Sequence, residues 1–250
     1  MTLNPESRWF GNQPVEEDEK TRLVHGVFTN VAAKYDLMND VMSGGLHRLW
    51  KRRFIKTVRP KAGQQCLDVA GGTGDIAFGL FEESCRKAHV TVCDLTPSMV
   101  EVGRDRAINK GIIKGIDWTV GNAEDLPFED NSFDHYTIAF GLRNVTRIDN
   151  ALHEAYRVLK PGGRFYCLEF SQPVVPMLEK IYDAYSFHII PKMGQLIAQD
   201  KESYQYLVES IRQFPNQEKL KMRLQSAGFS KPAYTDFTFG IVALHQGLKA

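Results

Sequence analysis

Short apolar runs alternate with longer amphipathic runs through the middle of this 250-residue chain. The apolar runs have the length of strands, and the amphipathic runs repeat every three to four residues, as the buried face of a helix does. The predicted strands are Cys66–Ala70, Val90–Cys93, Asp117–Val120, His135–Phe140 and Arg164–Phe170. The predicted helices between them are Ile76–Cys85, Pro97–Asn109 and Asn150–Leu159. This alternation predicts an α/β fold with a mostly parallel sheet and helices on both faces.

After residue 170, a predicted insertion interrupts the pattern, and helices and strands then follow to the end of the sequence. Residues 173–200 begin with an aromatic-rich, proline-bounded stretch, which predicts an insertion. Two further helices are predicted at Ser203–Arg212 and Glu218–Ala227. The closing strand candidates Ala233–Phe237 and Gly240–His245 have a link of only two residues, so we expect an antiparallel hairpin.

The amino-terminal sixty residues have a different character. Residues 1–20 are polar and are predicted to form a mobile arm ahead of a single domain that spans 21–250. Within that domain, residues 21–60 are predicted to form a helical cap. Leu46–Arg59 reads as a basic amphipathic helix, and its predicted apolar face is Leu46, Leu49, Trp50, Phe54 and Val58. The basic positions suit either a solvated face on a packed helix or a surface that contacts anionic lipid or a partner.

Composition narrows the functional class. The net charge of +1 predicts no general attraction to nucleic acid, and no apolar run approaches the ~20 residues of a membrane span. The first twenty residues resemble neither a signal peptide nor a transit peptide, which favours a cytoplasmic protein. The four cysteines form no C-x-x-C pair, so we expect buried thiols and no metal site.

The three glycines of residues 71–74 follow the first predicted strand and precede a helix, the usual setting for a nucleotide-like ligand. Gly72-x-Gly74-x-x-Ala77, with Asp94 about 20 residues further on, matches the dinucleotide fingerprint. The same stretch also reads as Asp68-x-Ala70-x-Gly72-x-Gly74. That is the loop that usually binds S-adenosylmethionine, with alanine in place of the first glycine.

Two features favour S-adenosylmethionine over a dinucleotide. The Asp68 carboxylate would repel a pyrophosphate, whereas it suits a ligand that carries an ammonium and a sulfonium group. The turn that starts at Asn122 can bond an adenine edge and cover its face. The glycine loop, Asp94 and Asn122 follow successive strands, so we expect them to converge on one crevice. Asp94 could instead cap the helix that begins near Pro97. The predicted cofactor-binding residues are Asp68, Gly72, Thr73, Gly74, Asp94, Asn122 and Ala123.

Six further segments are distinctive: FTNVAAKYDLMNDVMS (28–43), LHRLWK (46–51), FGLRNVT (140–146), YRVLKPGG (156–163), YDAYSFH (182–188) and SYQYL (203–207). Together they resemble the ubiquinone/menaquinone biosynthesis C-methyltransferase family of bacterial type, over roughly residues 20–250. The resemblance implies a Rossmann-like class I methyltransferase fold, a seven-stranded mostly parallel sheet whose last strand is antiparallel. One departure is Ala139, where relatives often have a serine that contacts the cofactor.

The resemblance also implies an activity. S-adenosyl-L-methionine would methylate a ring carbon of a polyprenylated benzoquinol of the 2-methoxy-6-polyprenyl-1,4-benzoquinol type, and demethylmenaquinol where menaquinone is made. A ring carbon becomes nucleophilic when a neighbouring hydroxyl loses its proton, so the site must favour the phenolate and exclude water. We expect contact with the inner face of the membrane through the basic helix or the insertion. Other quinone-biosynthesis enzymes and a second copy of the chain are candidate partners.

Four residues are candidates for the acceptor side of the site. Arg143 is expected to stabilise the phenolate or to position a proton-accepting water, and Asn144 to orient the hydroxyl. Tyr35 is expected to close over the substrate. His47 is the best candidate for a base, because the pKa of histidine side chains in general suits proton transfer near neutral pH. The structural alternative for His47 is a packed or surface histidine of the basic helix. For Arg143 it is an ion pair with Asp149 or Glu154.

Two other functional classes compete with this prediction. The dinucleotide fingerprint leaves open an oxidoreductase that uses NAD(P). A non-catalytic relative of the same fold, serving as a scaffold in a quinone-making complex, would also carry the family signatures.

Overall fold

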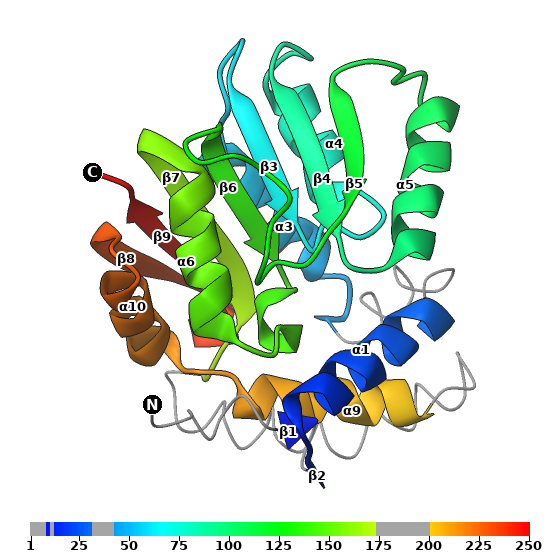
Figure 1. Cartoon of the computed structure of the whole chain (residues 1–250), viewed down its shortest axis with the longest axis vertical. Helices are drawn as coiled ribbons and strands as arrows, with labels where there is room; N and C mark the ends of the chain where they lie inside the picture. The colour runs from blue at the N-terminus through cyan, green and yellow to red at the C-terminus, as the bar shows by residue number, and fades with distance from the viewer. Residues whose placement is uncertain (1–8, 11–12, 32–42, 174–200) are drawn as a thin grey trace.

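The computed structural model describes residues 9–10, 13–31, 43–173 and 201–250, and its centre is a seven-stranded sheet (Figure 1). The strand order is β5-β4-β3-β6-β7-β9-β8. The strands are β3 (Gln65–Val69), β4 (His89–Asp94), β5 (Ile116–Val120), β6 (Phe133–Ala139), β7 (Leu159–Phe170), β8 (Ser230–Phe237) and β9 (Val242–Leu248). The pairs from β5 to β7 are parallel, and β9 is antiparallel to both β7 and β8. The predicted fold class is confirmed, including the antiparallel last strand.

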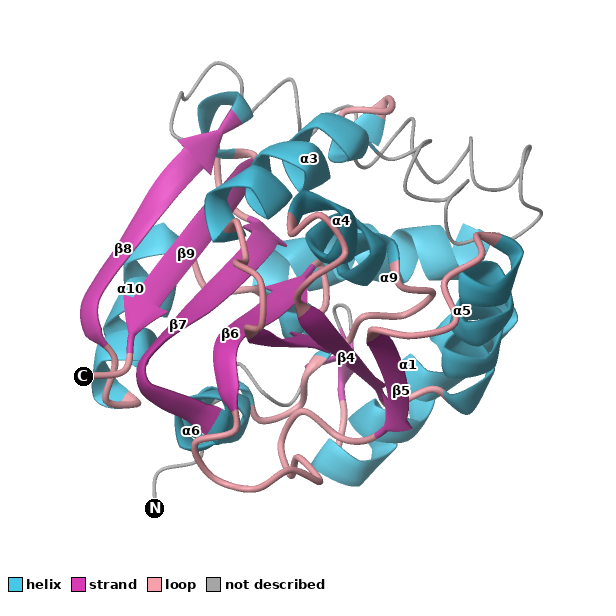
Figure 2. Ribbon diagram, turned by 90° about the horizontal axis from the view of Figure 1, so that it is seen from above, coloured by secondary structure: helices cyan, strands magenta, loops and turns pink. Residues whose placement is uncertain are grey.

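Helices cover both faces of the sheet (Figure 2). One face carries α3 (His47–Val58), α4 (Asp75–Glu83) and α5 (Pro97–Asn109), and the other carries α6 (Ile148–Val158) and α10 (Gln217–Ser226). Adjacent residues of β3 show why: Cys66 is buried in the cluster with α3 and α4, whereas Leu67 is buried in the cluster with α6 and α10. Side chains alternate across a strand, so a continuous apolar strand is buried on both faces.

Strand β7 and the closing hairpin differ in their bounds from the prediction. Strand β7 begins at Leu159, which pairs with Phe133, so the stretch predicted as a turn before Arg164 belongs to the strand. Gly162 has φ +81° in this part of the strand, and the pairing register shifts between Phe133 and His135. A strand can contain turn-forming residues at such an irregularity. The closing hairpin is antiparallel as predicted, but a 3₁₀ turn at Thr238–Gly240 makes its link longer than two residues.

The amino-terminal segment starts its helix earlier than predicted. Helix α1 is Glu17–Val31, and Lys20 is buried, so this helix already includes residues 17–20 of the predicted arm. Acidic residues in a first helical turn suit the helix dipole, which favours this earlier start. Strands β1 (Trp9–Phe10) and β2 (Gln13–Pro14) pair with each other ahead of it. The other residues of the predicted arm, 1–8 and 11–12, lie outside the described residues.

The predicted helical cap at 21–60 divides into two parts with different positions. Helix α1 lies at the carboxyl end of the parallel strands, together with α9 (Lys201–Gln213) (Figure 1). Helix α3 packs on a face of the sheet instead, with Trp50, Phe54 and Val58 buried. Leu46 and Leu49 are 43% and 58% exposed, so these two leucines do not belong to its buried face, contrary to the prediction. Residues 174–200 of the predicted insertion lie outside the described residues.

Candidate functional site

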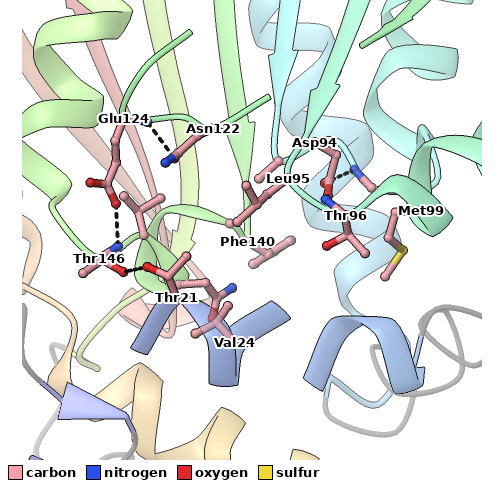
Figure 3. A pocket seen from close by; sticks show the side chains of 15 residues that line it. Thr21, Val24, Asp94, Leu95, Thr96, Met99, Asn122, Glu124, Phe140 and Thr146 are labelled. Atoms are coloured by element: carbon pink, nitrogen blue, oxygen red, sulfur yellow. Dashed lines mark hydrogen bonds between the residues drawn. The ribbon is translucent and has the colours of Figure 1, made fainter. Parts of the chain in front are cut away.

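A cavity opens at the carboxyl end of the parallel strands, where β3 and β6 are neighbours and the strand order reverses (Figure 3). Crevices at such a switch point are the usual ligand sites of open α/β sheets. The space amounts to about 730 Å³ when the part open to solvent is included. Its lining is Thr21, Val24, Ala70, Gly72, Asp94, Leu95, Thr96, Met99, Asn122, Glu124, Phe140, Gly141, Asn144, Val145 and Thr146. We call this space the main cavity.

Asp94 ties the glycine loop to the start of α5 beside the main cavity. The Gly72 amide donates to Asp94 Oδ2 at 2.8 Å, and the Thr96 amide donates to Oδ1 at 2.9 Å. Thr96 is itself the residue that precedes α5, so Asp94 is not the cap of that helix. Asp94 is largely buried and lines the main cavity, as its predicted role with a ribose requires.

Asp68 lines a smaller second cavity that shares Ala70, Gly72 and Phe140 with the main one. Its side chain is buried, and Thr137 donates a hydrogen bond to Oδ1 at 2.8 Å. Its other oxygen, Oδ2, is buried and has no hydrogen-bond partner among the described residues. Burial raises the pKa of this carboxyl to about 7. A carboxylate oxygen of this kind fits a cationic group such as an ammonium, and it disfavours a pyrophosphate.

The other predicted cofactor residues divide between contact and packing. Asn122 lines the main cavity, and Thr73 lines the second cavity and accepts a hydrogen bond from Arg106. Gly74 and Ala123 line neither cavity. Gly74 has φ +89°, and a Cβ there would lie 2.5 Å from the Trp118 ring, so this glycine is required for packing. Ala123 belongs to a hydrophobic cluster.

The predicted acceptor residues Arg143 and Asn144 lie in a 3₁₀ helix, η3 (Leu142–Asn144), but face different surroundings. Asn144 lines the main cavity and accepts a hydrogen bond from the Tyr206 hydroxyl at 3.0 Å. The Arg143 guanidinium lies 2.8 Å from Glu169, and both side chains are almost fully buried. The structure therefore brings Asn144 to the main cavity and does not bring Arg143 there.

The partner of Arg143 differs from both of the acids named as alternatives. Asp149 lies 3.3 Å from Arg223, and Glu154 lies 2.7 Å from Arg157. Glu169 stands at the end of β7, the strand next to β6, so its pairing with the turn after β6 follows from strand order. Sequence spacing alone favoured acids on the following helix.

Of the remaining two candidates, the structure describes His47 and does not describe Tyr35. His47 is the first residue of α3, and it is buried, with its amide donating to the Ser43 hydroxyl at 3.1 Å. It lines neither the main nor the second cavity, which matches the packed histidine named as its alternative. Tyr35 lies outside the described residues.

Helix α1 also contributes to the main cavity, which the sequence pattern did not predict. Thr21 and Val24 line the main cavity from this helix, and the Thr21 hydroxyl lies 2.9 Å from that of Thr146 (Figure 3). The buried Lys20 ammonium donates to the Val145 carbonyl at 3.3 Å, and desolvation lowers its pKa to about 8. These contacts join residues 125 apart in the sequence, so no local pattern could have indicated them.

Ala70, which stands in place of the first glycine of the loop, lies against Gly141, so we expect substitutions at these two positions to be coupled. Ala70 has φ +49°, and a Cβ built on Gly141 would lie 2.5 Å from its Cβ. We expect Gly141→Ala to lower the free energy of unfolding by about 1–3 kcal/mol through overpacking. Ala70→Gly in the same chain is expected to restore most of it, since glycine removes the clash and adopts positive φ freely. Urea denaturation of both variants measures this, and equal loss in the double variant would contradict it.

The chain is similar to known proteins over most of its length. The model of the ubiE/COQ5 methyltransferase family matches residues 15–249. A ubiquinone/menaquinone biosynthesis C-methyltransferase UbiE from Brucella abortus is 56% identical over 96% of this chain and 90% of its own length. The same enzyme from Brucella anthropi is 56% identical over 96% of this chain and 92% of its length.

Solved structures show the same fold at low sequence identity. A SAM-dependent methyltransferase from Thermotoga maritima has a TM-score of 0.65 at 20% identity, covering 91% of this chain and all of that one. Phosphoethanolamine N-methyltransferase 2 from Haemonchus contortus, solved with S-adenosyl-L-methionine, has a TM-score of 0.58 at 17% identity, covering 80% of this chain and 52% of that one. The family match spans nearly the whole sequence, so the chain belongs to the ubiE/COQ5 methyltransferase family.

Proposed function

We propose that this protein transfers a methyl group from S-adenosylmethionine to a ring carbon of a polyprenylated benzoquinol. The benzoquinol is of the 2-methoxy-6-polyprenyl-1,4-benzoquinol type, and demethylmenaquinol is the second acceptor where menaquinone is made. The observation that carries the proposal is 56% identity, over 96% of the chain, to enzymes named for ubiquinone and menaquinone biosynthesis. The buried, unpartnered Oδ2 of Asp68 supports the cofactor.

The chain's own residues would divide the binding of this cofactor among them. Asp68 would hold the ammonium group in the second cavity, Asp94 the ribose hydroxyls, and Asn122 the adenine edge in the main cavity. The bound cofactor supplies an electrophilic methyl group next to a sulfonium. Val24, Phe140 and other apolar side chains of the main cavity would reduce the access of water to the reacting atoms, which favours a reaction that neutralises an anion and a cation.

On the acceptor side, the residue that we place in contact with the ring is Asn144. Asn144 lines the main cavity, and its carboxamide would hold the oxygen of the phenolate beside the carbon to be methylated. Arg143 acts on this geometry from outside the cavity, because its guanidinium and backbone amide both bond Glu169 and hold the turn. Tyr35 keeps its proposed role of closing over the acceptor, which rests on the family signature.

The decisive experiment is lipid extraction from a strain that lacks the gene, with the accumulated quinone identified by mass. We expect the unmethylated quinol to accumulate, and the wild-type gene but not Asn144→Ala to restore the methylated product. A scaffold would restore the product with either gene, which would overturn the enzymatic role. Calorimetry excludes the oxidoreductase if S-adenosylhomocysteine binds and NAD(P) does not.

Cofactor binding is expected to strengthen as the pH rises through about 7. The Asp68 carboxyl has its pKa raised to about 7 by burial, and only its ionised form attracts an ammonium group. The stability of the ligand-free protein should change in the opposite direction, since the folded chain keeps a proton that the unfolded chain releases above 3.8. Calorimetry with S-adenosylhomocysteine over this pH range measures the first effect. Asp68→Asn should abolish both, and an unchanged pH dependence in that variant would contradict the assignment.

We also propose that the protein contacts the inner face of the membrane through α3. No helix among the described residues has the length and apolar content needed to cross a bilayer. Lys51 is paired with Asp75 at 3.0 Å. Arg52, Lys56 and Leu49 are exposed on the same helix. Leu46, just before the helix, and Arg59, just after it, are exposed as well. Such a mixture of cations and apolar side chains suits an anionic lipid surface.

Flotation with anionic liposomes at low salt tests this contact. We expect co-migration of the wild-type protein, and its loss in the variant Arg52→Glu/Lys56→Glu. The control is Lys114→Glu, an exposed lysine outside α3. If the wild-type protein does not float, or if the control loses flotation equally, α3 is not the membrane contact.

A further inference from the structure

We propose that Tyr206 is a positioning residue, which turns the carboxamide of Asn144 so that its NH₂ group faces the main cavity. This inference rests on the proposed function, in which that group meets the oxygen of the acceptor ring. Tyr206 lies on α9, 62 residues away in the sequence, and its hydroxyl donates to Asn144 Oδ1 at 3.0 Å.

The ring of Tyr206 is buried and stacked against a second aromatic ring. It is only 5% exposed, and the Phe10 ring stacks on it with a centroid distance of 4.3 Å and an interplanar angle of 17°. Phe10 comes from β1, so the amino-terminal hairpin contributes to the placement of the hydroxyl. A ring packed in this way keeps its hydroxyl in one place, which a hydrogen bond that orients another side chain requires.

The backbone of Asn144 is fixed independently of Tyr206. Its amide donates to the Gly141 carbonyl at 3.1 Å, and the preceding Arg143 amide donates to Glu169 Oε2 at 3.3 Å. The Arg143 guanidinium also donates to the Phe140 carbonyl, which closes the turn. With the backbone held, the orientation of the terminal amide is the remaining freedom, and the Tyr206 hydroxyl bonds that group directly.

The hydroxyl of Tyr206 acts as a donor rather than an acceptor. Burial raises the pKa of Tyr206, so the hydroxyl keeps its proton at neutral pH. The bond to Asn144 is the only hydrogen bond that this hydroxyl makes to the described residues. Its hydrogen therefore needs the carbonyl oxygen of the carboxamide as an acceptor. That assignment leaves the NH₂ group as the part of Asn144 that is available to the main cavity.

The orientation matters for the chemistry of the acceptor. An N–H group that faces the ring oxygen binds a phenolate more strongly than a phenol, because a hydrogen bond to an ionised acceptor is stronger. A carbonyl oxygen in the same position would repel the phenolate. Tyr206 thus favours the nucleophilic form of the acceptor without touching it, and it should leave cofactor binding unchanged.

A double-mutant cycle on purified protein tests the inference, with methylation of a short-chain benzoquinol as the activity. We expect Tyr206→Phe to lower kcat about tenfold, the scale of one lost hydrogen bond, and to move the pH profile of kcat to higher pH. Affinity for S-adenosylhomocysteine should change less than twofold. Asn144→Ala should lower kcat further, and adding Tyr206→Phe to it should have no additional effect. Tyr156→Phe, a tyrosine on α6, is the matched control and should keep wild-type activity.

Each result decides a different point. If both single losses multiply in the double variant, Tyr206 acts by another route and the inference is overturned. An unchanged kcat in Tyr206→Phe, or an equal loss of S-adenosylhomocysteine affinity, also overturns it. If the wild-type protein methylates no quinol, the proposed function fails instead, and the inference fails with it. Thermal melting of each variant separates these outcomes from loss of folding.

Discussion

Replacing Glu169 with alanine is expected to lower the free energy of unfolding by about 3–5 kcal/mol, because a buried arginine is left without its counter-charge. Glu169 Oε1 lies 2.8 Å from the Arg143 guanidinium, and the two side chains are 1% and 2% exposed. Glu169 also accepts hydrogen bonds from the amides of Arg143 and Phe170. Urea denaturation measures the change in stability.

Two further variants show whether the loss comes from the buried charge. Glu82→Ala removes an ion pair of similar distance, 2.6 Å to Arg86, in which both side chains are more than half exposed, so its effect should be small. The double variant Arg143→Met/Glu169→Met should regain most of the stability, since a buried pair is replaced by apolar groups. A loss for Glu169→Ala no larger than for Glu82→Ala would contradict the role of the pair.

Replacing Asp94 with alanine is expected to weaken S-adenosylhomocysteine binding by about 1–3 kcal/mol, from hydrogen bonds lost to the ribose. The same change removes the acceptor for the Gly72 and Thr96 amides, so the glycine loop loses its tie to α5. Both effects act in the same direction, and calorimetry measures their sum.

Asp94→Asn separates the two effects, because its carbonyl oxygen can still accept one of the backbone hydrogen bonds. We expect an affinity between those of the wild-type protein and Asp94→Ala. Asp117→Ala, at an exposed aspartate on β5, is the control for a lost carboxylate and should bind normally. Wild-type affinity in Asp94→Ala would show that this side chain does not contact the cofactor.

How far the sequence predicted the site depends on where each residue stands relative to a strand. Asp68, Asp94 and Asn122 line the two cavities, because parallel strands end at one edge of the sheet. Gly74 matched the fingerprint as well as Gly72 did, yet a Cβ there would collide with Trp118. A motif match cannot separate a glycine needed for a ligand from one needed for packing.

The sequence by itself determined the succession of strands and helices along the chain and the antiparallel last strand, because these follow from local periodicity and short links. It also determined the family, because the motifs of the family extend over most of the chain. Only the tertiary structure decided which of Arg143 and Asn144 faces the main cavity. A single 3₁₀ turn points neighbouring side chains in different directions, and the partners that select between them are Glu169 and Tyr206, from distant elements. The hydrogen bond between the hydroxyls of Thr21 and Thr146 likewise joins two elements that are distant in the sequence. Such pairs depend on the distance between elements after folding, which periodicity along the chain does not encode.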